Sequence, residues 1–254
     1  MMIIFHYDKT FEGLLTAVFD AYNRKTFPDK LFGLDDLDPL FVDESFTVIT
    51  DEEKSGRVWK ALEKKLQKGA QNMITYVWLS ELVGSDELIF RYVRKTIDSK
   101  HSIEINFADD DVSQMQKLAQ KVSRERLRLI ELVRFQKAAD DIFFAPVSPD
   151  HNSLPLTLDH FTDRFADQKW VIYDTKRNYG FYYNLKTVTE MTLDSTGLFP
   201  KGKLDEKLMA EDEKLYQELW KVYFKSMTIK ERINLKLQRQ HLPKRYWKYL
   251  TEKQ

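Results

Sequence analysis

Apolar residues in the first half of the chain follow two different spacings. Short apolar runs at about 2–6 and 45–50 predict buried strands. Elsewhere apolar residues recur every three or four positions, which predicts amphipathic helices. These helices are expected at about 11–24, 51–68, 70–82 and 86–98. The stretch 27–43, which carries Pro28, Gly33, Pro39 and several aspartates, predicts a loop.

The second half begins with a long amphipathic pattern and continues with strands. Helical spacing over about 110–133 predicts one long helix, and two runs, 134–138 and 142–147, predict a hairpin. A short helix is expected after Asn152 or Ser153. Three further runs predict an antiparallel meander: 170–173, 179–183 and 187–191. A linker with Gly and Pro, 196–203, precedes tail helices expected at about 207–226, 229–232, 235–241 and 244–250.

These elements predict an α+β protein in two units. Residues 1–108 are expected to form a small α/β unit, and residues 109–254 a long helix, an antiparallel sheet of about five strands and a helical basic tail. A chain of 254 residues is long enough to bury a sizeable core in one or two domains.

Charge is distributed unevenly along a chain whose net charge is zero. Residues 1–53 contain twelve acidic and four basic residues, a net charge of −8, whereas residues 221–254 contain ten basic and two acidic residues, a net charge of +8. These two ends could neutralise each other in the fold, or they could leave a basic face exposed to a polyanion.

Several classes of site and location are excluded or disfavoured by what the sequence lacks. Without cysteine, the chain has no disulfide, thiolate metal site or cysteine nucleophile. It also lacks the glycine-rich nucleotide-binding motifs and the zinc-protease, α/β-hydrolase and zinc-deaminase motifs. We therefore predict neither a cofactor nor a metal. The start of the chain is not a signal peptide and no apolar run could span a membrane, so we expect a soluble, cytoplasmic protein.

Candidate chemistry is concentrated at residues 143–183. His151 lies in a loop after Asp150, and His160 shares a predicted helix with Asp163 and Arg164. A histidine oriented by a carboxylate can act as a general base, so His151, His160 and Asp163 are the candidate catalytic residues. A structural role, a contact with phosphate or a divalent metal site remain alternatives for the same residues. Contact with a phosphate-bearing ligand is the interpretation we favour for His151, His160, Arg164 and Arg177.

Aromatic and basic residues are interleaved in two other places. The meander brings Arg177 and Tyr182 together, and the tail combines basic and aromatic side chains within a few residues. Such a combination suits phosphate contact plus base stacking, although the aromatic residues could instead pack in a core. The candidate nucleic-acid contacts are Arg164, Arg177, Tyr182, Arg239, Lys244, Arg245 and Trp247.

Long segments of the chain resemble an uncharacterised bacterial family assigned to DNA metabolism. They include FHYDKTFEGLLTAVFDAY, FFAPVSPDHN, HFTDRFADQKWVIYDTKRNYGFYYN and the closing stretch from YQELWKVYF to YWKYLTE. The resemblance implies a gene encoded beside a radical-SAM DNA repair protein, and a segment that some relatives join to a uracil-DNA-glycosylase-like domain. Since this chain has no cysteine to hold a radical-SAM cluster, that chemistry would belong to a partner. The family provides no catalytic residues to transfer.

Three hypotheses follow for the function. The first is an accessory protein of DNA repair and metabolism that binds single- or double-stranded DNA and works with a radical-SAM partner. The second is a hydrolase or lyase on damaged nucleotides, with His151 and His160 as acid/base groups and Asp163 as the orienting carboxylate. The third is a scaffold whose acidic N-terminal part binds a basic protein. The sequence does not decide whether the chain is catalytic.

Overall fold

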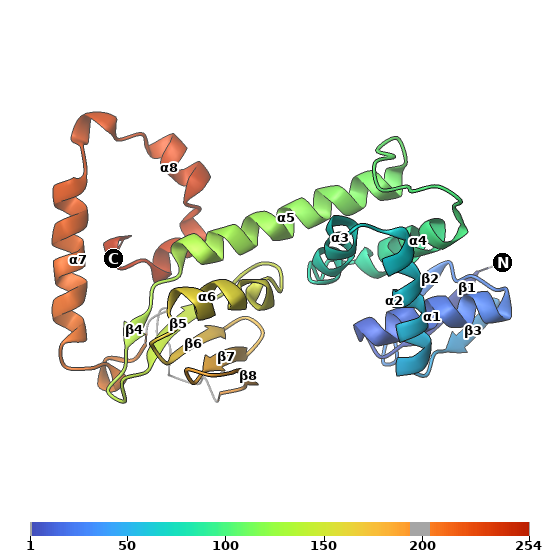
Figure 1. The fold of residues 1–254 in the computed structure, drawn as a ribbon, viewed down its shortest axis with the longest axis horizontal. Helices are drawn as coiled ribbons and strands as arrows, with labels where there is room; N and C mark the ends of the chain where they lie inside the picture. The colour runs from blue at the N-terminus through green and yellow to red at the C-terminus, as the bar shows by residue number, and fades with distance from the viewer. Residues whose placement is uncertain (1, 194–203, 254) are drawn as a thin grey trace. The chain divides into compact units, whose positions relative to one another are not determined.

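The computed structural model describes residues 2–193 and 204–253. The chain divides into two compact units, residues 1–123 and 124–254, which we describe separately (Figure 1). The sequence placed a boundary between residues 108 and 109, at the start of the long helix. In the structure the chain divides between residues 123 and 124, within that helix, α5 (Asp110–Leu132).

A three-stranded parallel sheet forms one layer of unit 1. Its central strand, β1 (Ile3–Tyr7), pairs with β2 (Lys30–Gly33) on one side and β3 (Glu44–Thr47) on the other. β1 is buried from Ile4 to Tyr7, as expected for a central parallel strand. β2 lies in the stretch 27–43, so the prediction of a loop there was wrong. Pairing of Leu31 with Phe5 outweighs the turn-forming residues on either side.

Four helices complete unit 1: α1 (Phe11–Arg24), α2 (Glu52–Lys65), α3 (Lys68–Trp78) and α4 (Ser85–Asp98). Two of them begin at side-chain caps. Thr10 accepts a hydrogen bond from the Gly13 amide, and Asp51 accepts from the amides of Glu53 and Lys54. The apolar faces of the helices form one core with β1, and the first half of α5 adds Val112 and Met115 to it.

A five-stranded sheet forms the centre of unit 2. The strands follow chain order: β4 (Gln136–Lys137), β5 (Phe143–Val147), β6 (Trp170–Asp174), β7 (Tyr179–Tyr183) and β8 (Val188–Met191). The predicted hairpin and meander are present. The sheet was expected to be antiparallel, but β5 and β6 are parallel and it is mixed. The connection between these two strands contains a helix, which allows the chain to return and run in the same direction.

That connection contains a 3-10 turn (Leu154–Thr157) followed by α6 (Leu158–Arg164). The apolar side of α6 packs on an aromatic core in which Phe161 and Trp170 are almost fully buried. Phe135 contacts Phe161 and Phe165 edge-on, with ring centroids 5.8 and 5.0 Å apart. The face of α6 predicted to be core is therefore core, and the side chains of Asp159, Asp163 and Arg164 are left exposed.

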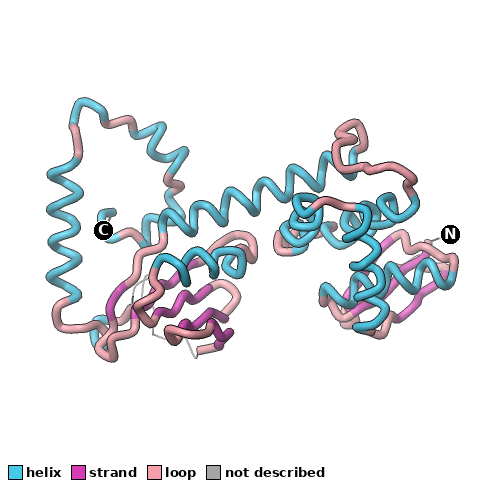
Figure 2. The backbone as a smooth tube through the Cα atoms, viewed as in Figure 1, coloured by secondary structure: helices cyan, strands magenta, loops and turns pink. Residues whose placement is uncertain are grey.

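The C-terminal part of unit 2 is helical, as predicted (Figure 2). It contains α7 (Glu213–Met227), α8 (Leu235–His241) and four short 3-10 turns, at Glu206–Leu208, Lys230–Arg232, Lys244–Tyr249 and Thr251–Lys253. The predicted linker 196–203 lies outside the described residues. Across residues 2–193 and 204–253, no helix has the length and apolarity that crossing a membrane requires.

Candidate functional site

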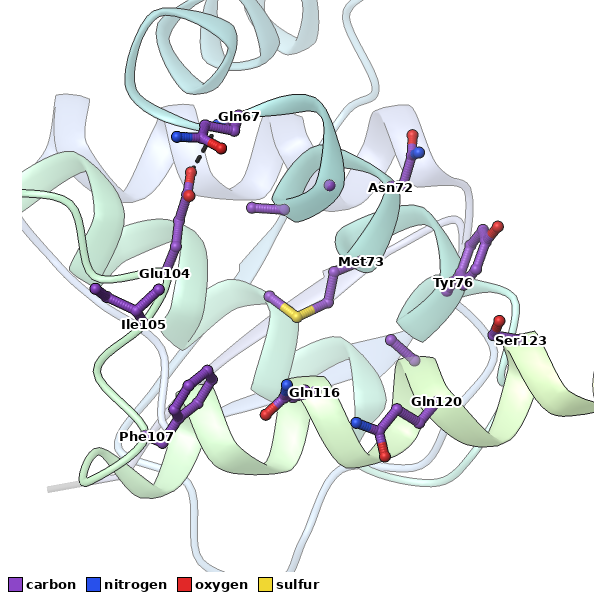
Figure 3. A pocket seen from close by; sticks show the side chains of 13 residues that line it. Gln67, Asn72, Met73, Tyr76, Glu104, Ile105, Phe107, Gln116, Gln120 and Ser123 are labelled. Carbon is purple, nitrogen blue, oxygen red and sulfur yellow. Dashed lines mark hydrogen bonds between the residues drawn. The ribbon is translucent and has the colours of Figure 1, made fainter.

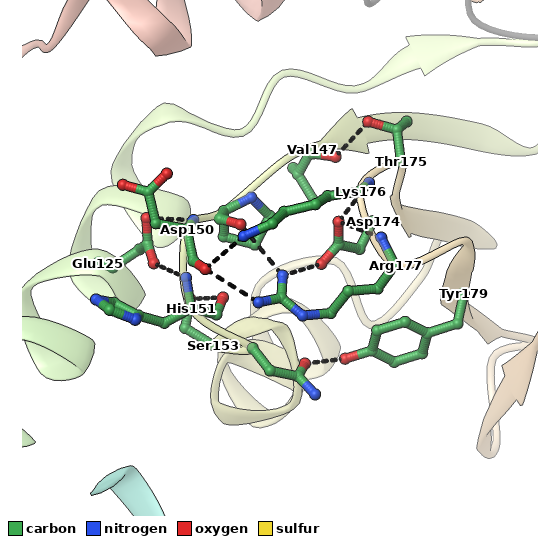
Figure 4. Close-up of polar contacts among 12 residues, drawn as sticks. Glu125, Val147, Asp150, His151, Ser153, Asp174, Thr175, Lys176, Arg177 and Tyr179 are labelled. Carbon is green, nitrogen blue, oxygen red and sulfur yellow. Dashed lines mark hydrogen bonds and ion pairs between the residues drawn. The ribbon is translucent and has the colours of Figure 1, made fainter. Parts of the chain in front are cut away.

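The loop after β5, residues 148–152, is held by a buried carboxylate from α5 (Figure 4). Glu125 is 1% exposed. Its Oε1 accepts a hydrogen bond from the backbone amide of Asp150 at 2.9 Å, and its Oε2 accepts from that of His151 at 2.7 Å. A buried carboxylate is tolerated when donors surround it, and two consecutive amides of the loop supply the first of these.

Two residues near the C-terminus complete the surroundings of Glu125. Arg245 Nη2 lies 2.6 Å from Glu125 Oε1, and the Tyr246 hydroxyl donates to the same oxygen at 3.1 Å. Arg245 also forms an ion pair with Asp150. Burial, followed by the charge of Glu125, raises the pKa of Tyr246, so its hydroxyl stays protonated and can donate. Glu125 therefore ties the loop to the C-terminal segment.

The turn between β6 and β7 holds the other side of the loop. Arg177 Nη1 donates to the fully buried Asp174 carboxylate at 2.8 Å and to the Pro149 carbonyl at 3.1 Å. Its Nη2 donates to the Asp150 carbonyl at 3.1 Å, and Lys176 Nζ donates to the same carbonyl at 2.8 Å. We refer to Glu125, residues 149–152, Asp174, Lys176, Arg177, Arg245 and Tyr246 as the loop network.

The predicted catalytic residues are distributed over two elements. His151 belongs to the loop network through its backbone, and its imidazole points away from the Arg177 guanidinium in Figure 4. His160 lies partly buried on α6, with its ring centroid 5.3 Å from that of Phe161. Among the residues described, neither His160 nor Asp163 forms a side-chain hydrogen bond or an ion pair. Asp163 therefore does not orient His160 here, and a catalytic role for these residues stays a prediction.

Metal ligation was one alternative for these side chains. In the part of the chain that the structure describes, no group of three or more His, Asp or Glu side chains is arranged to hold a metal ion.

The predicted nucleic-acid contacts fall into different environments. Arg177 and Arg245 take part in the loop network, and only 11% of the Arg177 side chain is exposed. Arg164 is exposed on α6 next to Phe165, and Tyr182 is half-buried on β7. Trp247 is also half-buried, and its indole donates to the Leu242 carbonyl at 3.0 Å. Of the seven predicted contacts, only Arg164, Arg239 and Lys244 are exposed without an ion pair among the described residues.

Residues 214–244, which we call the arm, are anchored to unit 2 at both ends. At one end, Glu213 is buried and accepts a hydrogen bond from the Lys137 amide of β4 at 3.0 Å. At the other end, Arg245 and Tyr246 contact Glu125. A third contact joins α7 to the final turn, because the Trp220 indole and Arg134 both donate to Glu252, at 2.9 and 3.0 Å.

Glu252 is ionised more easily than an ordinary glutamate. Burial alone would raise its pKa, but the hydrogen bond from Trp220 and the positive charge of Arg134 outweigh burial and place the pKa below its usual 4.5. Its carboxylate is therefore charged at neutral pH and holds the two donors together.

Between its anchors the arm is open to solvent. No residue from 214 to 244 is buried. Six basic residues here have no ion pair within the described part of the chain: Lys225, Lys230, Arg232, Lys236, Arg239 and Lys244. Large apolar side chains are exposed beside them, including Leu215, Tyr216, Leu219, Val222, Tyr223, Ile233 and Leu237. Thus the arm displays positive charge and apolar surface together.

Sequence reasoning missed the residues that organise the loop network. Glu125 lies three residues after Val122 and four before Leu129, so it occupies the buried stripe of α5. A carboxylate on the apolar stripe of a predicted helix was therefore the sequence feature that could have identified Glu125 as a buried residue. The neighbouring Arg126 donates from Nε to the Leu156 carbonyl at 2.8 Å. Asp174 lies just beyond the predicted run 170–173, and it is the fully buried last residue of β6.

Comparisons with known proteins identify a family without a described activity. No curated protein and no solved structure matches the chain. A family model matches residues 83–252, which is more than half of the chain and includes the loop network and the arm. This protein therefore belongs to the DUF4130 family, a domain of unknown function.

Proposed function

We propose that this protein binds nucleic acid along the arm and acts as an accessory factor in DNA metabolism. The observation that carries the proposal is the set of six exposed basic residues in the arm that have no ion pair among the described residues. From Lys225 to Lys244 the only acidic residue is Glu231. The association with DNA metabolism and with a radical-SAM partner rests on the resemblance of the sequence segments.

The arm is better suited than the loop network to bind phosphate, because most of its basic side chains have no ion pair among the described residues. Arg177 and Arg245 would have to give up internal carboxylates before contacting a phosphate. The six arm cations without an ion pair need no such exchange, and each phosphate that they neutralise releases bound counterions. Arg239 and Lys244, both candidates from the sequence, therefore remain in the proposed contact surface.

Exposed aromatic side chains favour single-stranded nucleic acid over the duplex. On α7, Tyr216 is 60% exposed and Tyr223 is 54% exposed. Lys225, which has no ion pair among the described residues, lies on the same helix. Stacking of a base on an aromatic ring contributes about 1–3 kcal/mol, and bases are available for stacking only where the strand is unpaired. An arm that combines both residue types therefore fits a single strand.

Fluorescence anisotropy with labelled single- and double-stranded oligonucleotides tests the proposal. We expect tighter binding of the single strand and a linear fall of log K with log salt concentration. Absence of binding at low salt, or binding that does not depend on salt, would contradict the proposal.

A matched pair of triple variants identifies the surface. Replacing Lys230, Lys236 and Arg239 by glutamine should weaken binding by more than about tenfold and lower the salt slope by about 2, because each lost phosphate contact contributes about 0.7 to it for a single strand. The control replaces Lys60, Lys64 and Lys117 by glutamine. These lysines are exposed on helices of unit 1, so the control variant loses the same amount of charge. Equal weakening in both variants would show a general charge effect instead of an arm surface.

Docking of a partner protein is a second candidate function, favoured by a different segment. Leu37, Leu40 and Phe41 are 91, 95 and 87% exposed in unit 1, and aspartates surround them. An acidic segment with exposed apolar side chains suits a basic protein surface. The test is co-purification with the radical-SAM protein that the resemblance implies. Serine at these three positions should abolish it, whereas the arm triple variant should not.

A further inference from the structure

A groove in unit 1 lies between α3, α5 and the loop at residues 104–107 (Figure 3). Its volume is ≈ 470 Å³, within the range of about 300–1,000 Å³ usual for small-ligand sites. The space exists because small residues face it: Gly69 and Ala70 on α3, and Ala119 on α5. Larger side chains at these positions would fill it.

The lining combines apolar walls with amide side chains. Met73 extends between the two helices, and Ile105 and Phe107 flank the opening, 80 and 52% exposed. Asn72, Gln116 and Gln120 also line the groove, and none of the three makes a side-chain hydrogen bond within the described residues. Gln116 and Gln120 are four residues apart, so they share one face of α5.

The charges that line the groove limit the class of ligand that it can bind. The only charged residue of the lining is Glu104, and its carboxylate already accepts a hydrogen bond from the backbone amide of Gln67 at 2.6 Å. Because no Lys, Arg or His lines the groove, a phosphate would meet a carboxylate and no cation. An alkyl chain would instead remove water from three amides without replacing their hydrogen bonds, which is unfavourable.

We propose that this groove binds an uncharged nucleobase or nucleoside. A base has two apolar faces, which match the walls at Met73, Ile105 and Phe107, and an edge that carries both donors and acceptors. Asparagine and glutamine amides pair with such edges through two hydrogen bonds, and aromatic rings stack on the faces. The groove lies entirely within residues 67–123, so the inference does not depend on nucleic-acid binding by the arm.

Ligand-observed NMR titration of the full chain tests the proposal. The probes are adenosine, guanosine, cytidine and thymidine, each compared with its 5′-monophosphate. We expect saturable binding of at least one nucleoside and weaker binding of its monophosphate in the groove. If none of the four nucleosides shows saturable binding, the proposal is wrong.

Two glycines provide a matched pair of variants. A Cβ added at Gly69 meets no atom within 4 Å, and the same holds at Gly56, which lies on α2 outside the groove. Both therefore accept leucine without a clash at the first added atom. Gly69→Leu fills the groove and should weaken nucleoside binding by at least about tenfold, since the ligand loses its space; Gly56→Leu should leave binding unchanged.

A second variant shows whether a loss of binding in Gly69→Leu comes from the filled groove or from altered folding. Replacing Gln116 and Gln120 together by alanine keeps good helix formers on α5 and removes two edge partners, so nucleoside binding should fall while the circular dichroism spectrum is unchanged. Nucleoside binding that survives both this variant and Gly69→Leu would place the site elsewhere and overturn the proposal.

Discussion

Arginine and tyrosine side chains occur in both the loop network and the arm, and they differ in what they contact. In the network, Arg177 and Arg245 are bonded to the buried carboxylates of Asp174 and Glu125. In the arm, Arg239 and Tyr223 are exposed, and Arg239 has no ion pair within the described residues. The first region uses charge to hold the protein together, whereas the second leaves charge available to a ligand.

This difference separates residues that the sequence grouped together. Arg177, Arg239, Lys244 and Arg245 were all predicted to contact phosphate, since each is basic and near aromatic residues. Arg245 immediately follows Lys244, yet only Arg245 contacts Glu125. Proximity to aromatic residues along the chain therefore does not show whether a cation is free, because the partner can be more than a hundred residues away.

The largest effect is expected from removing the carboxylate at the centre of the loop network. Glu125→Ala leaves two loop amides and the Tyr246 hydroxyl without their acceptor and removes one of the two carboxylates that Arg245 contacts, so unfolding should require about 3–5 kcal/mol less free energy. Urea denaturation of the full chain measures this change. The control is Glu131→Ala, at an exposed position of the same helix, which should change stability by less than about 0.5 kcal/mol. Similar losses in the two variants would contradict a structural role for Glu125.

A paired substitution tests the comparison between the two regions directly. Arg177→Gln should lower the free energy of unfolding by about 1.5–3 kcal/mol, because the buried Asp174 loses a charged partner. Arg239→Gln should leave stability unchanged and weaken oligonucleotide binding. Urea denaturation gives the stability of each variant, and anisotropy gives its affinity for the oligonucleotide. The comparison is wrong if Arg177→Gln reduces binding while stability is retained.

Stacking on the arm is tested by one exposed aromatic residue. Tyr223→Ala should weaken single-strand binding by about 1–2 kcal/mol, in the lower part of the range for base stacking, and leave duplex binding nearly unchanged. Anisotropy with both oligonucleotides measures the difference. An equal loss for the two forms would indicate that Tyr223 does not stack on bases.

The smallest effect is expected at the third contact of the arm. The pKa of Glu252 is lowered in the folded protein, so its contribution is present above the ordinary pKa of 4.5 and is lost as the pH falls through the lowered value. Glu252→Gln should therefore reduce the acid-dependent part of the unfolding free energy by about 1 kcal/mol. Urea denaturation of the wild-type protein and of Glu252→Gln at several pH values measures this change. If the two proteins show the same dependence of unfolding free energy on pH, Glu252 does not cause that dependence.

Much of the fold was predictable because local patterns determine it. The helices of unit 1, the hairpin and the meander follow from apolar spacing alone. β2 and the parallel pairing of β5 with β6 depend on contacts between distant segments, which spacing does not reveal. The loop network is harder still, because Glu125 meets Asp150 and Arg245 only after folding. The exposure of the arm likewise reflects the absence of a covering segment among the described residues.

Hydrogen exchange of the full chain with and without a single-stranded oligonucleotide shows whether the arm or the loop network binds nucleic acid. We expect nucleic acid to slow exchange in residues 222–244 and to leave residues 147–153 and 174–179 unchanged, because six arm cations have no ion pair among the described residues and those of the loop network are already bonded. Slowed exchange confined to the loop network, with no change in the arm, would contradict it.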